Sequence, residues 1–71
     1  MLRLERERVR AGLSRSALAR LALMHSATVG QIENGYIGRP YPVQLAKLAS
    51  ALMFEGEPAD LLDQVRADDD E

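Results

Sequence analysis

The chain lacks the residues on which disulfides, metal sites and most catalytic chemistry depend: among its 71 residues there is no cysteine and only one histidine. Neither disulfides nor thiolate zinc sites can form without cysteine, and His25 alone cannot build a metal site. No Ser/His/Asp, Cys/His or paired-carboxylate set can be assembled around a single histidine, which disfavours an enzyme. We therefore expect no metal, no cofactor and no small-molecule ligand.

Long apolar runs are absent as well. No stretch approaches the ~18 to 20 apolar residues of a membrane span, and the segment from Arg3 to Arg10 is too polar for a signal peptide. These features predict a cytoplasmic protein with no membrane partner.

Aromatic residues are few, with two tyrosines, one phenylalanine and no tryptophan, although 46% of the residues are hydrophobic. No alternating run of strand length appears, so we expect an aliphatic, all-α core and no sheet. A chain of this length buries only about 60 to 65% of its unfolded surface, which leaves no room for an enzyme cleft beside the core. The composition therefore indicates a single small domain.

Charge is divided unequally along the chain, which has a net charge of −2. Residues 1 to 40 carry seven arginines against three glutamates, a net charge of +4. Residues 41 to 71 carry one lysine and one arginine against eight acidic residues, a net charge of −6. This asymmetry indicates one surface that faces nucleic acid and an acidic surface elsewhere. We divide the chain into a domain over residues 1–66 and an acidic tail over residues 67–71, which we expect to be disordered.

Apolar spacing predicts five helices. Leu45, Leu48 and Leu52 fall at i, i+3 and i+7, the spacing of an amphipathic helix. Gly12 ends the first helical pattern, and Pro58 fits the first position of the last one. The predicted helices span residues 2–11, 15–22, 26–34, 43–53 and 58–66.

The second and third predicted helices are separated by a short turn. Ser14 is a good N-cap for the second helix, and Ser26 can cap the third. Val29 and Ile32 supply an inward-facing pair three residues apart, and the small side chain of Ala19 lets the two helices approach closely. This layout is how a helix is presented to a DNA groove.

Several segments, in their order and spacing, carry a resemblance to a known family. They are Arg8, Gly12-Leu13-Ser14, Leu18-Ala19, Val29, Ile32-Glu33-Asn34-Gly35, Arg39-Pro40 and the run from Leu45 to Leu52. Together they resemble the Cro and repressor type of helix-turn-helix protein, the XRE-like or lambda-repressor-like family, over almost the whole chain. The loop from Gly35 to Pro40 is similar in length to that of the phage 434 repressor and Cro pair. The resemblance implies a compact, all-α, five-helix DNA-binding domain.

The resemblance also places base contacts on the outward face of the third helix. The positions concerned are Ser26, Ala27, Thr28 and Gln31. Gln31 is the strongest candidate because its amide can pair with adenine N6 and N7, at about 1 to 3 kcal/mol of discrimination for a good bidentate pair. The methyl group of Ala27 or Thr28 can touch a thymine methyl. The alternative is that Gln31 is merely solvated. No Arg or Lys lies between residues 25 and 34, so specificity leans on DNA shape.

Contacts to phosphate need donors near helix N-termini and in loops. Arg15 opens the second helix. Asn34, Tyr36 and Arg39 follow the third, where members of the resembled family clamp the DNA backbone. The alternative for Arg39 is a solvated loop charge.

Arg8 and Glu33 match an ion pair of the phage repressors that links the first helix to the end of the third. The resemblance implies a structural role, since removing one partner of a buried pair costs about 3 to 5 kcal/mol. The alternative is two exposed charges worth under about 1 kcal/mol.

Two departures from the family pattern stand out. Leu23 occupies the turn position where the family usually has Gly, and a non-Gly residue forced to positive φ costs roughly 1 to 2 kcal/mol. The turn therefore either bends differently or tolerates the strain. Residues 53 to 57 include a short insertion relative to the phage relatives, which predicts a different docking angle for the fifth helix.

A lone domain of this size gains affinity for DNA by dimerising, so that two recognition helices enter major grooves ~34 Å apart on a pseudo-palindrome. Leu61, Leu62 and Val65 are the candidate dimer residues; the alternative is that they only complete the monomer core.

The sequence therefore predicts a DNA-binding transcriptional regulator of a phage or bacterium that occludes a promoter as a homodimer. The alternative is a protein-interaction module of the same fold, such as an antitoxin or adaptor. The weakly polar outer face of the third helix favours that alternative, and the positively charged half of the chain opposes it.

Overall fold

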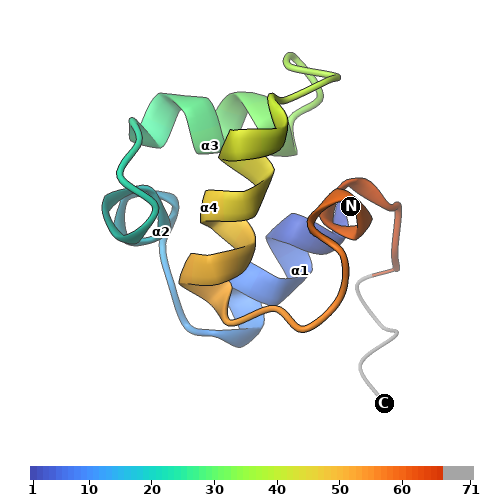
Figure 1. Cartoon of the computed structure of the whole chain (residues 1–71), viewed down its shortest axis with the longest axis horizontal. Coiled ribbons are helices and arrows are strands. Elements are labelled where there is room, and N and C mark those ends of the chain that lie inside the picture. Colours follow the sequence, from blue (N-terminus) through green and yellow to red (C-terminus); the bar gives the residue numbers. More distant parts are fainter. Residues whose placement is uncertain (67–71) are drawn as a thin grey trace.

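The computed structural model describes residues 1–66, so the predicted acidic tail lies outside the described part of the chain. Its elements are α1 (Arg3–Arg10), α2 (Arg15–Leu21), α3 (Ser26–Glu33), α4 (Pro42–Leu52) and a short 3-10 helix, η1 (Pro58–Leu62). No strand is present among residues 1–66. Helix α3 lies along one edge of the molecule, with α2 and α4 beside it and α1 and η1 toward the opposite side (Figure 1).

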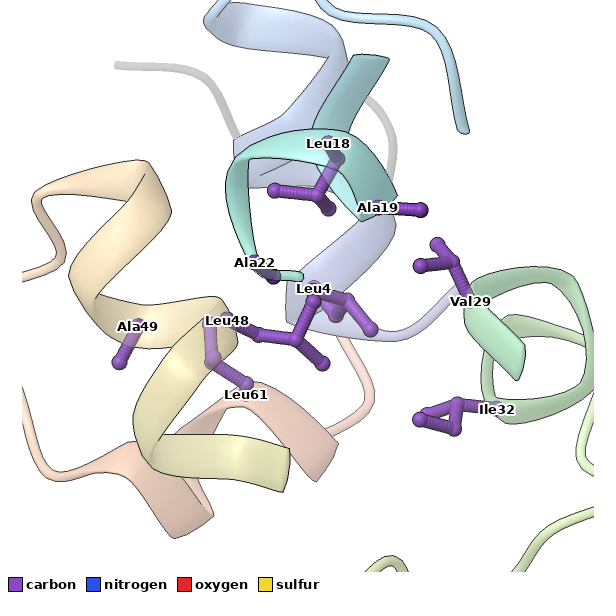
Figure 2. Packing of buried hydrophobic residues seen from close by; sticks show 9 residues of the cluster. All are labelled: Leu4, Leu18, Ala19, Ala22, Val29, Ile32, Leu48, Ala49 and Leu61. Atoms are coloured by element: carbon purple, nitrogen blue, oxygen red, sulfur yellow. The ribbon is translucent and has the colours of Figure 1, made fainter. Parts of the chain in front are cut away.

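Each helix contributes at least one fully buried aliphatic side chain to the core (Figure 2). These side chains are Leu4 from α1, Leu18 from α2, Val29 and Ile32 from α3, Leu48 from α4 and Leu61 from η1. Burying one such side chain stabilises the fold by about 1.5 to 3 kcal/mol. The all-aliphatic core expected from the composition is thus what holds the helices together.

Small side chains set how closely α2 and α3 approach. Ala19 is only 2% exposed, and its side chain points from α2 toward Val29 of α3 (Figure 2). The expectation that Ala19 lies at the close approach of these two helices is confirmed. A larger residue in place of Ala19 would push α3 away from the core.

Of the two predicted serine caps, one is confirmed and one is wrong. The side chain of Ser14 accepts a hydrogen bond from the N–H of Ala17 at 3.0 Å, which caps α2. Helix α3 begins one residue earlier than a Ser26 cap requires: its N-cap is His25, whose side chain makes no capping bond. The polar Ser26 side chain is left on the exposed surface of the first turn.

The prediction of a fifth α-helix over residues 58–66 is wrong. The chain forms only η1 and is extended from Asp63 onward, where it pairs with the first residues of the domain. The N–H of Arg3 donates to the carbonyl of Asp63, and the N–H of Val65 donates to the carbonyl of Met1, each at 2.8 Å. These long-range bonds satisfy the backbone groups that a longer helix would have satisfied internally.

The three candidate dimer residues have different surroundings. Leu61 is fully buried, so it completes the monomer core and has no surface left for a second copy. Leu62 and Val65 are half-buried. This result takes Leu61 out of the dimer surface predicted from the sequence.

Leu23 and Met53 are the non-glycine residues with positive φ, at 58° and 54° respectively, among the described residues. Leu23 lies in the turn after α2, and Met53 is the residue at which α4 ends. The turn after α2 therefore keeps the left-handed conformation that the family pattern predicts, and Leu23 tolerates the strain. The cost is roughly 1 to 2 kcal/mol for Leu23 and a similar amount for Met53.

We expect Leu23→Gly to raise the free energy of unfolding by about 1 kcal/mol, because glycine adopts this conformation without strain and the lost side chain is 81% exposed. Thermal denaturation should show a melting temperature about 4 to 8 °C higher. The matched control is Gly35→Ala, which forces a side chain into φ 83° with no neighbouring atom to clash and should lower stability. A lower melting temperature for Leu23→Gly would contradict the strain argument.

Candidate nucleic-acid interface

Helix α3 has one buried side and one open side. Val29, Ile32 and Glu33 face the interior. Ser26, Ala27 and Gln31 are exposed, and Thr28 and Gly30 are half-buried. The four residues predicted to contact bases therefore lie on the part of α3 that the rest of the fold leaves largely uncovered.

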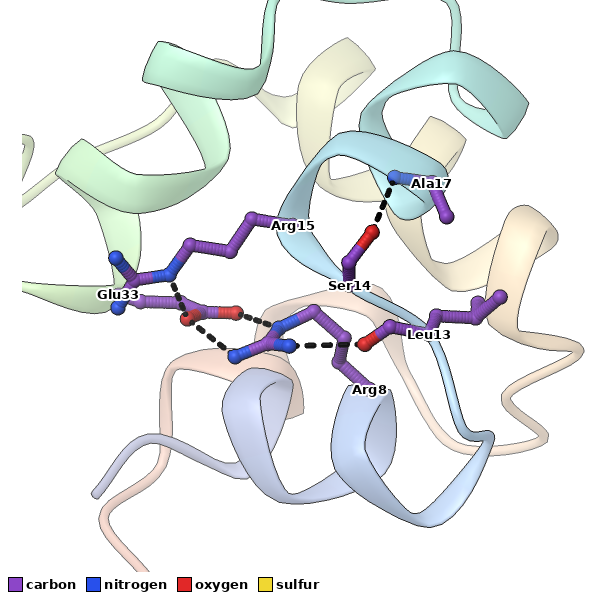
Figure 3. Close-up of polar contacts among 6 residues, drawn as sticks. All are labelled: Arg8, Leu13, Ser14, Arg15, Ala17 and Glu33. Carbon is purple, nitrogen blue, oxygen red and sulfur yellow. Dashed lines mark hydrogen bonds and ion pairs between the residues drawn. The ribbon is translucent and has the colours of Figure 1, made fainter.

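The carboxylate of Glu33 joins three helices (Figure 3). Its side chain is fully buried and accepts from Arg8 twice: from Nε at 2.7 Å and from Nη2 at 3.1 Å. Nη1 of Arg8 donates to the carbonyl of Leu13 at 2.9 Å, in the loop between α1 and α2. Arg8, which is 13% exposed, thus ties α1 and that loop to the last turn of α3.

Arg15 makes the third contact to this carboxylate, which the sequence analysis missed. Its Nε donates to Oε1 of Glu33 at 2.9 Å, so α2 is also tied to the end of α3. Residues 15 and 33 are 18 positions apart, and no local pattern in the sequence indicates their contact. The second guanidinium also gives the buried cluster a net charge of +1.

The geometry leaves part of Arg15 available to a ligand. The side chain is 41% exposed, and its two terminal nitrogens have no partner within residues 1–66. Gly30 lies next to this guanidinium, and a Cβ at that position would come 3.6 Å from Nη1. The end of Arg15 therefore lies beside α3 at Gly30, one turn before the helix ends.

The hydrogen bonds to Glu33 raise the pKa of Arg8 above its ordinary value, against the opposing effect of burial. A group whose pKa is raised on folding contributes stability that is fully present below its unfolded pKa and is lost only when the pH exceeds the folded pKa. The folded and unfolded pKa of Arg8 both lie far above neutral pH, so Arg8 stays charged at neutral pH and its contribution to stability does not change there.

The other predicted phosphate contacts follow α3 directly. Asn34 is the C-cap of α3 and is exposed, as are Tyr36 and Arg39 in the next loop. A hydrogen bond of 3.1 Å from the N–H of Ile37 to the carbonyl of Gln31 holds this loop against the helix. Since Arg15 contacts the last residue of α3, it lies at the same end of the helix as Asn34.

Within residues 1–66, no group of three His, Cys, Asp or Glu side chains is arranged to hold a metal ion. In that part of the chain no helix has the length and hydropathy needed to cross a membrane.

A sequence model of the helix-turn-helix domain family matches residues 2–62, from the start of α1 to the end of η1. The chain belongs to this helix-turn-helix family. Neither the curated proteins nor the solved structures contain a significant match. In a helix-turn-helix domain the second helix of the motif is the one placed against DNA, and here that helix is α3.

Removing one partner of the buried ion pair in this helix-turn-helix domain should destabilise the fold strongly. We expect Glu33→Ala to lower the free energy of unfolding by about 3 to 5 kcal/mol, because Arg8 is left charged and largely buried. The double variant Arg8→Met/Glu33→Leu should lose less than Glu33→Ala, since no buried charge remains unpaired. Urea denaturation of both variants measures the difference.

The control is Arg10→Ala, which removes an exposed pair in which the side chains of Arg10 and Glu7 are 3.4 Å apart. Its effect should stay below about 1 kcal/mol. A loss of that small size for Glu33→Ala would mean that the buried pair contributes no more than a surface pair.

Proposed function

We propose that this helix-turn-helix domain binds double-stranded DNA through the outer face of α3 and acts as a transcriptional regulator of Cro/repressor type. In this proposal it occludes a promoter as a dimer on a pseudo-palindromic operator. The observation that carries the proposal is the two-sided α3. Its inner side is fixed to α1 and α2 through Glu33 and the core, while Ser26, Ala27 and Gln31 remain exposed.

Phosphate contacts are proposed at the end of α3 and in the loop after it. Arg15 has two unpartnered terminal nitrogens there, and Arg39 is exposed. A guanidinium held in place by Glu33 loses less conformational freedom on binding phosphate than a free one. Asn34 and Tyr36, which are also exposed, add neutral donors. These contacts set register and affinity without reading sequence.

Base readout is proposed to be sparse. Gln31 offers the bidentate amide, and the exposed methyl group of Ala27 suits a thymine methyl. Thr28 is half-buried, which reduces its reach. With no cation on α3, much of the sequence preference would come from DNA shape and deformability.

The central test is a titration of the protein against a random-sequence duplex at several salt concentrations. Each phosphate neutralised by an arginine should contribute about −0.9 to the slope of log K against log salt, so Arg15 and Arg39 predict a slope of about −1.8 for each bound domain. Arg39→Gln should make it shallower by about 1. Arg66→Gln removes an exposed cation that has no part in the proposed interface, and should change little. A wild-type slope shallower than about −1, which is less than one arginine contact would give, would contradict DNA binding.

Gln31→Ala tests base readout separately. Selection from a random-sequence duplex library should give the wild type a preference for adenine at one position, which the variant loses with a discrimination change of about 1 to 3 kcal/mol. The salt slope on random duplex should stay the same, because Gln31 is not proposed to contact phosphate. An unchanged sequence preference would leave Gln31 as a solvated side chain.

A further inference from the structure

An exposed apolar groove runs between the end of α2 and one side of α4. The residues that line it are Leu21, Ala22, Leu23, Val43, Ala46, Lys47, Ser50, Ala51 and Met53. Four of these are large apolar side chains that stay in water: Leu21 is 58% exposed, Leu23 81%, Val43 59% and Met53 83%. None of the lining residues belongs to α3 or to the loop after it.

Backbone strain coincides with this groove. Leu23 and Met53, the non-glycine residues with positive φ among residues 1–66, both line it. Each follows a helix at a position where glycine would be free of strain, and each instead places a large apolar side chain in water. In the isolated molecule these two residues add strain and exposed apolar surface, with no compensating burial. A contact outside the single chain would supply that burial.

We propose that a second copy of this chain covers the groove, so that it is the dimer surface of the helix-turn-helix domain. The four large side chains leave roughly 500 Å² of apolar surface in water, near the upper end for the largest patch on a monomer. Across a two-fold axis this surface doubles to about 1,000 Å², the lower limit for a specific interface. The area thus suits a weak, reversible dimer that DNA reinforces.

Shape and chemistry agree with a self-complementary contact. Leu23 and Met53 protrude, while Ala46, Ser50 and Ala51 give the groove small side chains against which a partner's large ones can pack. In a two-fold dimer the same surface must supply both the protrusions and the space that receives them. Lys47 and Ser50 provide polar groups beside the apolar contact.

The inference deepens the proposed function and rests on it for the role of the dimer. A groove that includes no α3 residue can be covered while both recognition helices stay free for DNA.

The first test uses the double variant Leu23→Gly/Met53→Gly, which removes both protrusions and both strained conformations. Sedimentation equilibrium should show a wild-type dimer with a dissociation constant in the micromolar to millimolar range. The variant should associate at least tenfold more weakly, with a melting temperature no lower than that of the wild type. A wild type that stays monomeric throughout this range, or a variant that dimerises equally well, would overturn the proposal.

A second, matched pair separates the groove from general hydrophobicity. Val43 and Val9 are both 59% exposed, but only Val43 lines the groove. Val43→Ser should therefore weaken self-association severalfold and Val9→Ser should leave it unchanged. Equal effects of the two substitutions would count against a specific surface.

DNA binding by the same proteins distinguishes failure of this inference from failure of the proposed function. A random-sequence duplex of about 12 base pairs holds one domain, and one of about 30 base pairs holds two on the same face. Wild type and the double glycine variant should bind the short duplex equally, and only the wild type should bind the long one cooperatively. A protein that dimerises through the groove but binds neither duplex would retain this inference and refute the DNA-binding proposal. Cooperative binding by the variant would refute the dimer surface alone.

Discussion

The contact of the Glu33 carboxylate with two guanidinium groups is the interaction on which the placement of α3 depends. Helix α3 has only eight residues, too few to be stable as an isolated helix in water. Val29 and Ile32 bury its apolar side, but apolar contacts alone fix a helix poorly against rotation and sliding. Directional bonds to Arg8 of α1 and Arg15 of α2 supply the missing constraint. The position of the surface proposed to contact DNA is therefore set by buried interactions inside the molecule.

In the proposed function, this arrangement separates the two tasks of α3, which are to hold its place in the fold and to contact DNA. The residues that hold the helix in place do not have to recognise anything, and those on the outside do not have to support the fold. Ser26, Ala27 and Gln31 can in principle change with little effect on stability, whereas Glu33 cannot. Arg15 belongs to both groups, because Nε binds the buried carboxylate while its terminal nitrogens remain free for a ligand.

Local sequence patterns were sufficient to predict the positions of α1 to α4, because each pattern lies within one helix and its caps. The spacing of Leu45, Leu48 and Leu52, for example, requires no knowledge of the rest of the fold. The fifth helix was predicted wrongly because Leu61, Leu62 and Val65 have helical spacing, while the backbone partners of that segment lie at the other end of the chain. The contact of Arg15 with Glu33 and the groove between α2 and α4 likewise could not be predicted from local sequence patterns, since their residues meet only in the folded molecule. The pairing of Arg8 with Glu33 came from family resemblance and not from spacing.

The pairing of residues 1–3 with residues 63–65 has a consequence for how the domain forms. Met1 and Val65 exchange backbone hydrogen bonds across 64 positions, whereas α2 and α3 are neighbours in sequence and close on each other through a short turn. Contacts between distant residues are formed slowly, because a long loop must close before they contribute any stability. The helix-turn-helix unit can thus assemble before the ends meet.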